Sequence, residues 1–403
     1  MKTTIVGGGI AGLFAAVKLA RAGHEVTLFE KGEHGGRARS PKLGERAVNL
    51  GAHAIYRAGR AKAELKALGV KWNGQPPSST GGFVLDGDEL LPLGLTAMSL
   101  SASPLLSGGR VSFFRALMEV ERAKSSDDQL TVAQWLNQFS LPRRPRLLLQ
   151  LLLRVASYIE APELASAGPV VRNFKLAINA NVSYLEGGWA TIVDQLRAMA
   201  VEAGVTLRQA RVEAVRAEGT VVLADGEQVT ADAVLTTLPL RDSARLTGSP
   251  ELQRLAESAV ESRAACLDVV LDRLPRADHR VGFGLERPTY FSVHFDDERG
   301  AQVHLMRYLA PGDDGSGARE ELEAMLDRAQ PGWRERVKDL RFMPHLTVMS
   351  RVPLPGESVM PVAVSEKVIA AGDWCGPGLL LDRTLSSTAI ACERLLQSAK
   401  LAA

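Results

Sequence analysis

The stretch TIVGGGIAGLFAAVKLARAGHEVTLFEKGEHGGRARS, residues 4–40, decides the fold. Its apolar start at residues 4–6 predicts a short buried strand, and three glycines follow that strand at once. Residues 13–22 then carry apolar side chains at helical spacing, with Gly23 placed to end the helix. A second strand is expected over residues 24–29. This order of strand, glycine turn, helix and strand is typical of an α/β fold with a parallel sheet.

The glycines Gly7, Gly9 and Gly12 have the G-x-G-x-x-G spacing of a dinucleotide-binding turn. Gly7 supplies the tight turn, Gly9 removes a Cβ that would collide with a phosphate, and Gly12 lets the helix pack closely on the sheet. The start of the helix directs unpaired N–H groups and the positive end of its dipole at the same point. The segment therefore predicts a site for the pyrophosphate of a dinucleotide.

The second strand leads into Glu30, roughly 20 residues beyond the glycines, where an acidic side chain can accept hydrogen bonds from a ribose. A carboxylate at this position disfavours a 2′-phosphate, which argues against NADP. Glycine-rich turns without a ligand occur in many α/β proteins. Here the flanking strand and helix, together with the acid, favour dinucleotide binding.

A second glycine pair, Gly35 and Gly36, follows Glu30 and is itself followed by Arg37. Simple nicotinamide dehydrogenases do not need such a pair, whereas an extended FAD molecule has a flavin-side phosphate and a ribitol still to be held. The planar guanidinium of Arg37 suits phosphate oxygens. A surface turn with solvated arginines is the alternative interpretation.

The other end of the chain carries a matching signal in VIAAGDWCGPGLLLDRTLSSTAIACERLL, residues 368–396. Residues 368–371 predict a buried strand that runs into a turn at Gly372 and then into a helix. The carboxylate of Asp373 can accept a hydrogen bond from a sugar-like hydroxyl. We therefore expect the two ends of the chain to bind one FAD molecule.

With these motifs the chain resembles the flavin-dependent amine oxidase and phytoene desaturase superfamily, whose members carry G-G-R-x-x-S/T just after the first two strands. The resemblance implies that the Ala-Gly-Asp run contacts the ribitol and that the following helix begins at the pyrimidine edge of the flavin, near Leu381 and Asp382. It also implies a backbone contact from Val212 to the adenine. Ser387 matches a serine of the family, and Thr388 stands where relatives usually have glycine.

The stretch from Asn49 to His53 resembles the D-x-G-x-H segment of the same superfamily, with Asn49 in place of the usual acid. The resemblance implies a position beside the isoalloxazine ring. His53 is then a flavin neighbour or a proton shuttle, because imidazole titrates near neutral pH. A histidine that only bonds to the backbone is equally compatible, so no catalytic residue is assigned.

These arguments give one predicted set of cofactor-binding residues. It comprises Gly7, Gly9, Ile10, Ala11, Gly12, Glu30, Lys31, Gly36, Arg37, Gly51, Ala52, His53, Val212, Gly372, Asp373, Leu381 and Asp382.

Composition excludes several classes of partner. A chain of 403 residues with a net charge of +2 and no strongly basic tract gives no indication of nucleic-acid binding. The three cysteines lack C-x-x-C spacing, so neither a disulfide framework nor a zinc site is predicted, and a reducing cytoplasm is expected. His294 and His304 have no third ligand nearby in the sequence, which argues against a metal site.

The N-terminus enters the first strand without room for a secretory signal, and no apolar run approaches the roughly 20 residues of a spanning helix. One stretch, residues 141–154 with sequence LPRRPRLLLQLLLR, places arginines beside leucines as helices on membrane surfaces do. Packing between domains explains the leucines equally well. We expect a soluble cytoplasmic protein, with peripheral contact to the inner membrane face as an alternative.

The predicted architecture is a discontinuous Rossmann-like FAD-binding domain of the α/β class with an interleaved substrate domain. The first comprises residues 1–72, 181–240 and 350–403, and the second comprises residues 73–180 and 241–349. Within the FAD-binding domain we expect a helix over 190–203, strands over 205–209 and 233–238, and a β-meander that turns at Asp225 and Gly226. Residues 73–180 look largely helical, and residues 264–310 predict an antiparallel sheet.

The resemblance implies an FAD-dependent oxidoreductase of the phytoene desaturase type, which takes hydride from, or isomerises, an apolar isoprenoid. Two alternatives stay open. In the family, an amine oxidase uses a lysine near flavin N5; no residue matches it convincingly, and Lys175 stays open. A non-catalytic flavin-binding protein would keep the fold alone. The aromatic candidates for the substrate pocket, each better explained as core, are Tyr184, Trp189, Tyr290, His294 and Trp374.

Overall fold

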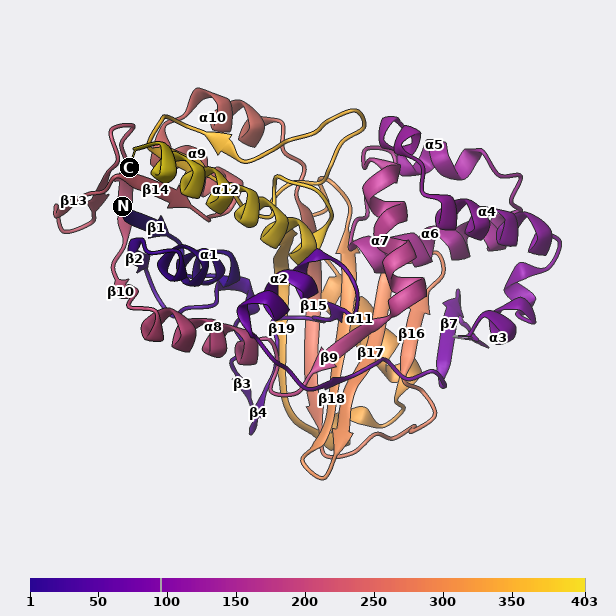
Figure 1. Ribbon diagram of the computed structural model, residues 1–403. Coiled ribbons are helices and arrows are strands. Elements are labelled where there is room, and N and C mark those ends of the chain that lie inside the picture. The colour runs from indigo at the N-terminus through magenta and orange to yellow at the C-terminus, as the bar shows by residue number, and fades with distance from the viewer. Residues whose placement is uncertain (95, 403) are drawn as a thin grey trace.

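The computed structural model describes residues 1–94 and 96–402 and contains two large sheets (Figure 1). The first has six strands, in the order β10-β2-β1-β14-β21-β20. Their bounds are β10 Thr206–Gln209, β2 Glu25–Glu30, β1 Lys2–Val6, β14 Ala233–Thr236, β21 Val368–Ala370 and β20 Val362–Ala363.

The first five strands of this sheet are parallel, although they come from both ends and the middle of the chain. Helices α8 (Ala190–Glu202) and α12 (Leu380–Ala402) both pack against α1 (Ile10–Arg21) beside it, and the apolar side chains of all three share one buried core with the sheet. Gly23, with φ of +91°, follows Ala22, the C-cap residue of α1. The predicted parallel α/β fold is confirmed.

A three-stranded antiparallel meander covers part of the same sheet. It consists of β11 (Val212–Val215), β12 (Thr220–Leu223) and β13 (Gln228–Thr230). The hairpin between β12 and β13 turns at Asp225 and Gly226, as the sequence predicts, since Gly226 adopts a φ of +90°.

The second large sheet has seven strands, in the order β19-β15-β18-β17-β16-β7-β8. Their bounds are β19 Val337–Met349, β15 Ser262–Leu271, β18 Gly300–Leu309, β17 Thr289–Asp297, β16 Val281–Gly284, β7 Gly82–Asp86 and β8 Glu89–Pro92. All neighbours are antiparallel except β16 and β7. The sheet predicted within residues 264–310 is confirmed, whereas β7 and β8 lie in a region for which helices were expected.

The two faces of the seven-stranded sheet differ because successive side chains of a strand point to opposite sides. One face is apolar and packs against α11 (Ala318–Ala329), with Leu267, Phe291 and Leu305 among its buried residues. The opposite face carries polar and aromatic side chains, and we call it the inner face. It is turned toward the segment around Gly51.

A helical layer lies beside the inner face and shares a hydrophobic core with it. Its helices are α3 (Ala97–Ser101), α4 (Arg110–Arg122), α5 (Val132–Asn137), α6 (Arg143–Ser157) and α7 (Ala167–Ala180). The smaller elements of the chain are α2 (Arg60–Leu68), α9 (Leu240–Thr247), α10 (Pro250–Glu257), β3 (Lys42–Leu43), β4 (Arg46–Ala47), β5 (Ile55–Tyr56), β6 (Gly74–Gln75) and β9 (Val182–Leu185).

Helix α6 contains the leucine block that suggested membrane contact. Leu148 and Leu149 are fully buried in the core under the inner face, and Arg143 and Arg144 form ion pairs with acidic side chains. Core packing thus accounts for these leucines. Among the residues that the structure describes, no helix has both the length and the apolar character needed to cross a bilayer.

Candidate functional site

The first glycine turn joins β1 to α1, and the three glycines have distinct surroundings. A Cβ on Gly12 would lie 1.8 Å from the carbonyl oxygen of Gly7, so α1 can pack this closely only without a side chain there. A Cβ on Gly9 would meet its nearest atom, the carbonyl oxygen of Gly35, at 4.0 Å. Gly12 is therefore glycine for packing, whereas Gly9 leaves an open space at the start of the helix, as a phosphate site requires.

Glu30 ends β2 beside this turn. Its carboxylate accepts hydrogen bonds from the backbone N–H of Gly8 at 2.7 Å and of Gly32 at 3.1 Å. A Cβ on Gly8 would come within 2.8 Å of the Glu30 side chain. Gly8, to which the sequence motif gave no role, thus lets the acid lie against the glycine turn. Lys31 follows, exposed, directly after the strand.

The second glycine pair lies directly against the first. The backbone N–H of Gly35 donates to the carbonyl of Gly8 at 2.7 Å, and Gly9 and Gly35 form a parallel bridge. Gly35 and Gly36 both adopt positive φ, +112° and +54°, which glycine tolerates at little cost. The two glycine motifs therefore form one continuous backbone surface.

The two ends of the chain meet at an ion pair. Nη1 of Arg37 lies 2.8 Å from Oδ2 of Asp373, 336 residues away in the sequence. Asp373 also accepts hydrogen bonds from Ser350, through its backbone N–H at 2.7 Å and its hydroxyl at 2.9 Å. Burial raises the pKa of Asp373, but Arg37 and Ser350 outweigh it, so the pKa is lower than usual. The sequence predicted a phosphate partner for Arg37 and a sugar partner for Asp373; here each side chain also binds the other.

The Arg37 side chain is 39% accessible, although its partner Asp373 is buried. His53, Tyr56 and Tyr158 are also only half-buried. We infer that these four side chains line one region between the ion pair and the helical layer, and we call this region the hollow.

One wall of the hollow is the segment 48–53, which we call the strap. The side-chain oxygen of Asn49 accepts hydrogen bonds from the Ser40 hydroxyl at 2.7 Å and from the backbone N–H of Trp189 at 2.8 Å. Asn49 therefore ties the strap to the end of the second glycine motif and to the start of α8. Within the strap, Gly51 has φ of +82°, and Ala52 accepts a hydrogen bond from the Tyr158 hydroxyl at 2.9 Å.

His53 closes the strap. Its ring is perpendicular to that of Trp189 at 5.1 Å between centroids, and its Nδ1 lies 3.3 Å from the carbonyl oxygen of Gly51. Burial lowers the pKa of His53 to about 4. The ring is therefore neutral at pH 7, which differs from the expected titration near neutral pH and argues against a proton shuttle that works by titrating there.

Asp382, at the start of α12, also contacts a second helix. The carboxylate of Asp382 accepts hydrogen bonds from the backbone N–H groups of Arg60 at 3.1 Å and Ala61 at 2.9 Å, and so caps α2. Leu381 is partly buried in the core of the six-stranded sheet. Leu380 adopts φ of +55°, an uncommon conformation for a residue with a side chain.

The other predicted cofactor residues take up these positions. Ile10 and Ala11 are buried in the first turn of α1, and Val212 is buried at the start of β11. Gly372 is followed by Trp374, whose indole Nε1 lies 2.7 Å from where a Cβ on Gly372 would be and donates to the carbonyl of Leu238 at 3.2 Å. Trp374 belongs to the core of the six-stranded sheet, away from the inner face.

All five tyrosines of the chain gather around the inner face and the strap: Tyr56, Tyr158, Tyr184, Tyr290 and Tyr308. The hydroxyls of Tyr184 and Tyr290 lie 3.3 Å apart, and the Tyr184 ring stacks on His294 at 3.6 Å. Four of the five aromatic pocket candidates, all except Trp374, therefore lie in this region. Burial raises the pKa of every tyrosine in the cluster, so all stay protonated at pH 7.

Sequence reasoning missed a charged group on the inner face. Asp268 on β15 is fully buried and accepts hydrogen bonds from Nδ1 of His304 at 2.6 Å and Nη2 of Arg341 at 2.6 Å. The signal was an acid within the otherwise apolar strand AACLDVVL, since a buried carboxylate requires partners. Among the described residues, no group of three or more side chains forms a metal site.

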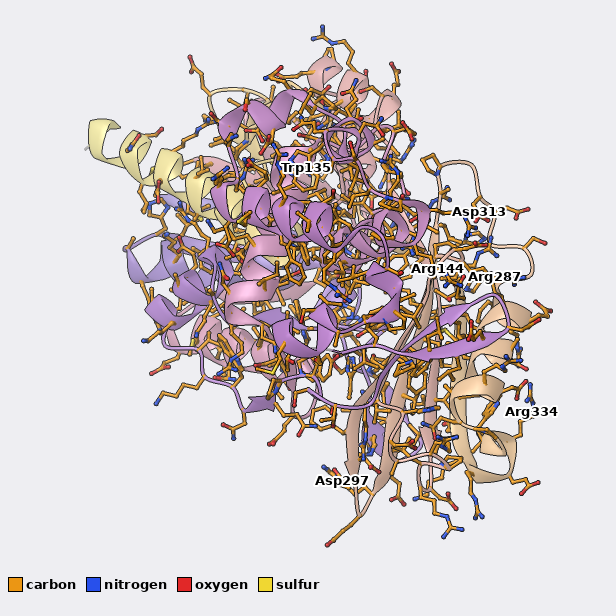
Figure 2. All side chains as sticks on the ribbon, turned by 90° about the vertical axis from the view of Figure 1, so that its right-hand side faces the viewer. Trp135, Arg144, Arg287, Asp297, Asp313 and Arg334 are labelled. Atoms are coloured by element: carbon orange, nitrogen blue, oxygen red, sulfur yellow. The ribbon has the colours of Figure 1, made fainter. Side chains whose placement is uncertain are left out.

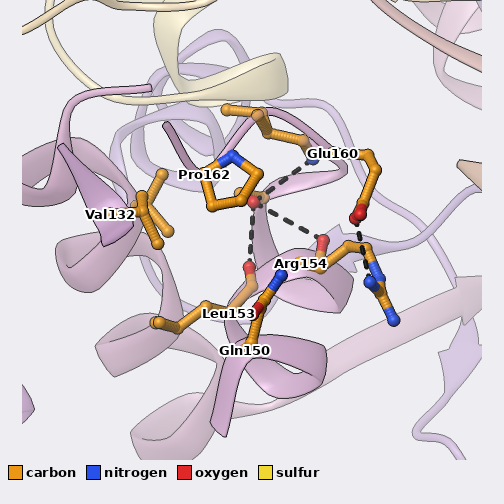
Figure 3. Close-up of a pocket in the computed structure, with 9 residues that line it drawn as sticks. Val132, Gln150, Leu153, Arg154, Glu160 and Pro162 are labelled. Atoms are coloured by element: carbon orange, nitrogen blue, oxygen red, sulfur yellow. Dashed lines mark hydrogen bonds and ion pairs between the residues drawn. The ribbon is translucent and has the colours of Figure 1, made fainter. Parts of the chain in front are cut away.

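A small cavity between α5, α6 and α7 lies outside this site (Figure 3). Its volume is about 10 Å³, and Ser157 at its wall donates to the carbonyl of Leu153 at 2.8 Å. That volume suits a single water molecule at most. The cavity is thus a packing feature of the helical layer.

The sequence profile described as flavin containing amine oxidoreductase matches residues 10–321. The chain belongs to this family. A curated relative from Methanothermococcus thermolithotrophicus, described as an uncharacterized protein in the nifH2 3′ region, is 44% identical over 55 residues. This match covers 14% of the chain and 54% of the relative, so it spans about half the length of that protein.

Solved structures share the fold over the whole chain. An oxidoreductase from Methanosarcina mazei superposes with a TM-score of 0.80 at 17% identity, covering 98% of this chain and 100% of that one. Cyclohexylamine oxidase from Brevibacterium oxydans gives a TM-score of 0.74 at 14% identity, covering 99% of each chain. At such identities the similarity establishes the fold alone.

FAD is the cofactor of the family, and the residues of this chain fit it. The open space at Gly9, the carboxylate of Glu30 and the partly accessible guanidinium of Arg37 lie around the two joined glycine motifs. Asp373 brings the C-terminal end to the same place. The chain is therefore an FAD-dependent oxidoreductase.

Proposed function

We propose that the protein is an FAD-dependent oxidoreductase of the phytoene desaturase type, which takes hydride from, or isomerises, an apolar isoprenoid substrate. Bound FAD supplies the hydride acceptor for such a reaction. The protein then has to bind the substrate, orient one C–H bond and exclude water. The aromatic rings and the paired carboxylates around the hollow support this proposal.

The proposal rests on the hydrogen bonds of two half-buried tyrosines, Tyr56 and Tyr158. The hydroxyl of Tyr56 donates to the carbonyl of Ala156 at 2.7 Å, and that of Tyr158 donates to the carbonyl of Ala52 at 2.9 Å. Since each hydroxyl already donates to a backbone carbonyl, the aromatic rings are the parts of the two side chains that remain to contact a ligand. Aromatic rings suit a flat, unsaturated, apolar molecule.

The charged groups around the hollow support the same conclusion. Asp373 pairs with Arg37, Asp268 pairs with Arg341, and Asp382 caps α2. Each carboxylate is therefore already engaged within the protein. No free carboxylate among these three is left to bind a cationic substrate.

Amine oxidation is the second candidate, since cyclohexylamine oxidase shares the fold. The resemblance implies a lysine near flavin N5 for amine oxidases. Lys175, the candidate from the sequence, lies on α7 and pairs with Glu121 at the outer side of the helical layer. None of the lysines whose burial the structure describes is buried.

Anaerobic bleaching of the flavin tests the proposal. The purified holoprotein is mixed in parallel with an unsaturated isoprenoid hydrocarbon, squalene, and with an amine, cyclohexylamine. We expect bleaching, or rearrangement of double bonds detected by chromatography, with the hydrocarbon alone. Bleaching by the amine alone would establish the second candidate, and no reaction with either would favour a non-catalytic flavin protein.

A matched pair of variants at Tyr158 sharpens the test. Tyr158→Phe keeps the ring and removes the hydroxyl bond to Ala52, whereas Tyr158→Ala removes both. If the ring binds the substrate, Phe should retain bleaching within a few-fold of wild type and Ala should lose most of it. Equal losses in both variants would show that the hydroxyl bond, and not the ring, matters.

A further inference from the structure

The strap is held from two sides, and the side that faces the sheet uses a buried charge pair. Asp268 is fully buried and accepts from the backbone N–H of Gly51 at 3.2 Å, in addition to its bonds from His304 and Arg341. The carboxylate thus connects strand β15 directly to the strap. Gln302 contacts the other ring nitrogen of His304 at 2.8 Å and so fixes the imidazole behind Asp268.

Arg341 on β19 binds the strap backbone at two further points. Its Nη2 donates to the carbonyl of Asn49 at 2.6 Å and to that of Val48 at 3.2 Å, while Nε and Nη2 both face Asp268. One guanidinium therefore joins a carboxylate and two carbonyl groups. A planar group with several fixed donors can do this, whereas a lysine ammonium on a flexible stem cannot match the geometry.

The strap also lies as close to the sheet as its backbone allows. A Cβ on Gly51 would come within 3.0 Å of Sγ of Cys266 on β15.

Burial raises the pKa of Asp268, but His304 and Arg341 outweigh it and hold the pKa below its usual value. The carboxylate is therefore ionised at neutral pH and accepts all of these hydrogen bonds.

We propose that Asp268 and Arg341 are positioning residues that fix the strap, and with it His53, at the flavin end of the FAD site. The proposal rests on the FAD cofactor and on the place of the strap, which Asn49 joins to Ser40 at the end of the second glycine motif, not on the identity of the substrate. Neither residue takes part in the chemistry. Their effect reaches the cofactor through the backbone of residues 48–51.

The deciding variant is Arg341→Lys, examined in the FAD-loaded protein. Lysine keeps the positive charge beside Asp268 but cannot also donate to both carbonyls of the strap. We expect the visible absorption bands of the bound flavin to shift and its midpoint potential to change, with FAD content close to wild type. Because these readouts need no substrate, failure of the proposed hydrocarbon reaction would leave this test intact.

Arg46→Lys is the matched control. Arg46 is a buried arginine that pairs with Asp297 and donates to the carbonyl of Gly300 at 2.9 Å, so it also joins the N-terminal part of the chain to the seven-stranded sheet. Figure 2 shows Asp297, the partner of Arg46, at the lower tip of the strands, far from Trp135 in the helical layer. We expect Arg46→Lys to leave the flavin spectrum and potential unchanged.

Asp268→Asn provides a second, independent variant. Asparagine keeps the shape but removes the charge that holds both Arg341 and His304, so it should shift the flavin spectrum in the same direction as Arg341→Lys. The proposal is overturned if both variants have the spectrum and potential of wild type, or if Arg46→Lys changes them equally. If Arg341→Lys does not fold, the comparison of Asp268→Asn with Arg46→Lys decides.

Discussion

The two large sheets contribute to the FAD and substrate region in different ways. The six-stranded sheet acts through backbone at the ends of β1 and β2, where glycines and Glu30 form one continuous surface. The seven-stranded sheet acts through side chains spread over its inner face, such as Asp268 and Tyr290. We infer that substitutions in the first region decide whether FAD is held, whereas those in the second change what surrounds it.

The largest effect is expected at Gly12. Alanine there would place a Cβ 1.8 Å from the Gly7 carbonyl oxygen, so α1 must move away from the turn. We expect Gly12→Ala to lower the free energy of unfolding by about 3 kcal/mol and to yield mostly apoprotein. Urea unfolding and the flavin-to-protein absorbance ratio measure both.

Gly32→Ala is the control for that substitution, because a Cβ on Gly32 would meet nothing within 4 Å. We expect it to change stability by no more than about 0.5 kcal/mol and to retain FAD. Similar losses in the two glycine variants would contradict the packing role of Gly12.

The ion pair that joins the two ends should have the next largest effect. Asp373→Asn keeps the shape and leaves Arg37 without its counter-charge, for an expected loss of about 2 kcal/mol at pH 7, less than for a fully buried pair because Arg37 is partly accessible. The folded pKa of Asp373 lies below its unfolded value, so its contribution is present above about pH 4 and is lost as the pH falls further. Chemical denaturation of both proteins at pH 7 and pH 3 measures the difference between their free energies of unfolding. A difference that is larger at pH 3 than at pH 7 would rule the pairing out.

A smaller, pH-dependent effect is expected from the strap. His53 has a pKa of about 4 in the folded protein, below its unfolded value near 6.5, so the unfolded chain binds the proton first as the pH falls. Wild type should therefore lose about 1–2 kcal/mol relative to His53→Gln between pH 7 and pH 5. Thermal unfolding at both pH values checks this, and a constant difference between the two proteins would show that His53 is not held neutral.

The smallest effect has the opposite sign. The hydroxyl of Tyr308 on the inner face is buried and has no hydrogen-bond partner among the described residues. Removing it in Tyr308→Phe should stabilise the protein by about 0.5–1 kcal/mol. Ser350→Ala, which removes a hydroxyl bonded to Asp373, should destabilise it, and melting temperatures that move in the same direction would contradict the contrast.

The sequence allowed good predictions for the cofactor region because its contacts come from short motifs. The residue types indicate the backbone geometry in three short motifs: the G-x-G-x-x-G turn, the second glycine pair with Arg37, and the Gly-Asp turn. We expected these motifs to lie close together in space because one extended cofactor has to contact all of them. The assignment of individual residues to FAD contacts, and the domain boundaries, stay predictions.

The substrate region was less predictable because its contacts join strands that are far apart in the chain. Arg341 lies 73 residues from Asp268, and Asp268 lies 217 residues from Gly51. No local pattern specifies such pairs. Strand β19 was missed because VKDLRFMPHLTVM mixes charged and apolar residues, its side chains are mostly half-buried, and its register shifts against β15 at several points.

The order of strands in the six-stranded sheet has a consequence for synthesis. Strand β1 pairs with β14, and β14 pairs with β21, near residue 370. The first glycine motif therefore leaves the ribosome long before the strands that complete its sheet, and during that time it lacks neighbours on one side. We therefore expect uptake of the cofactor to follow translation of β21 and α12, so ribosome-bound chains that end before residue 368 should stay free of flavin.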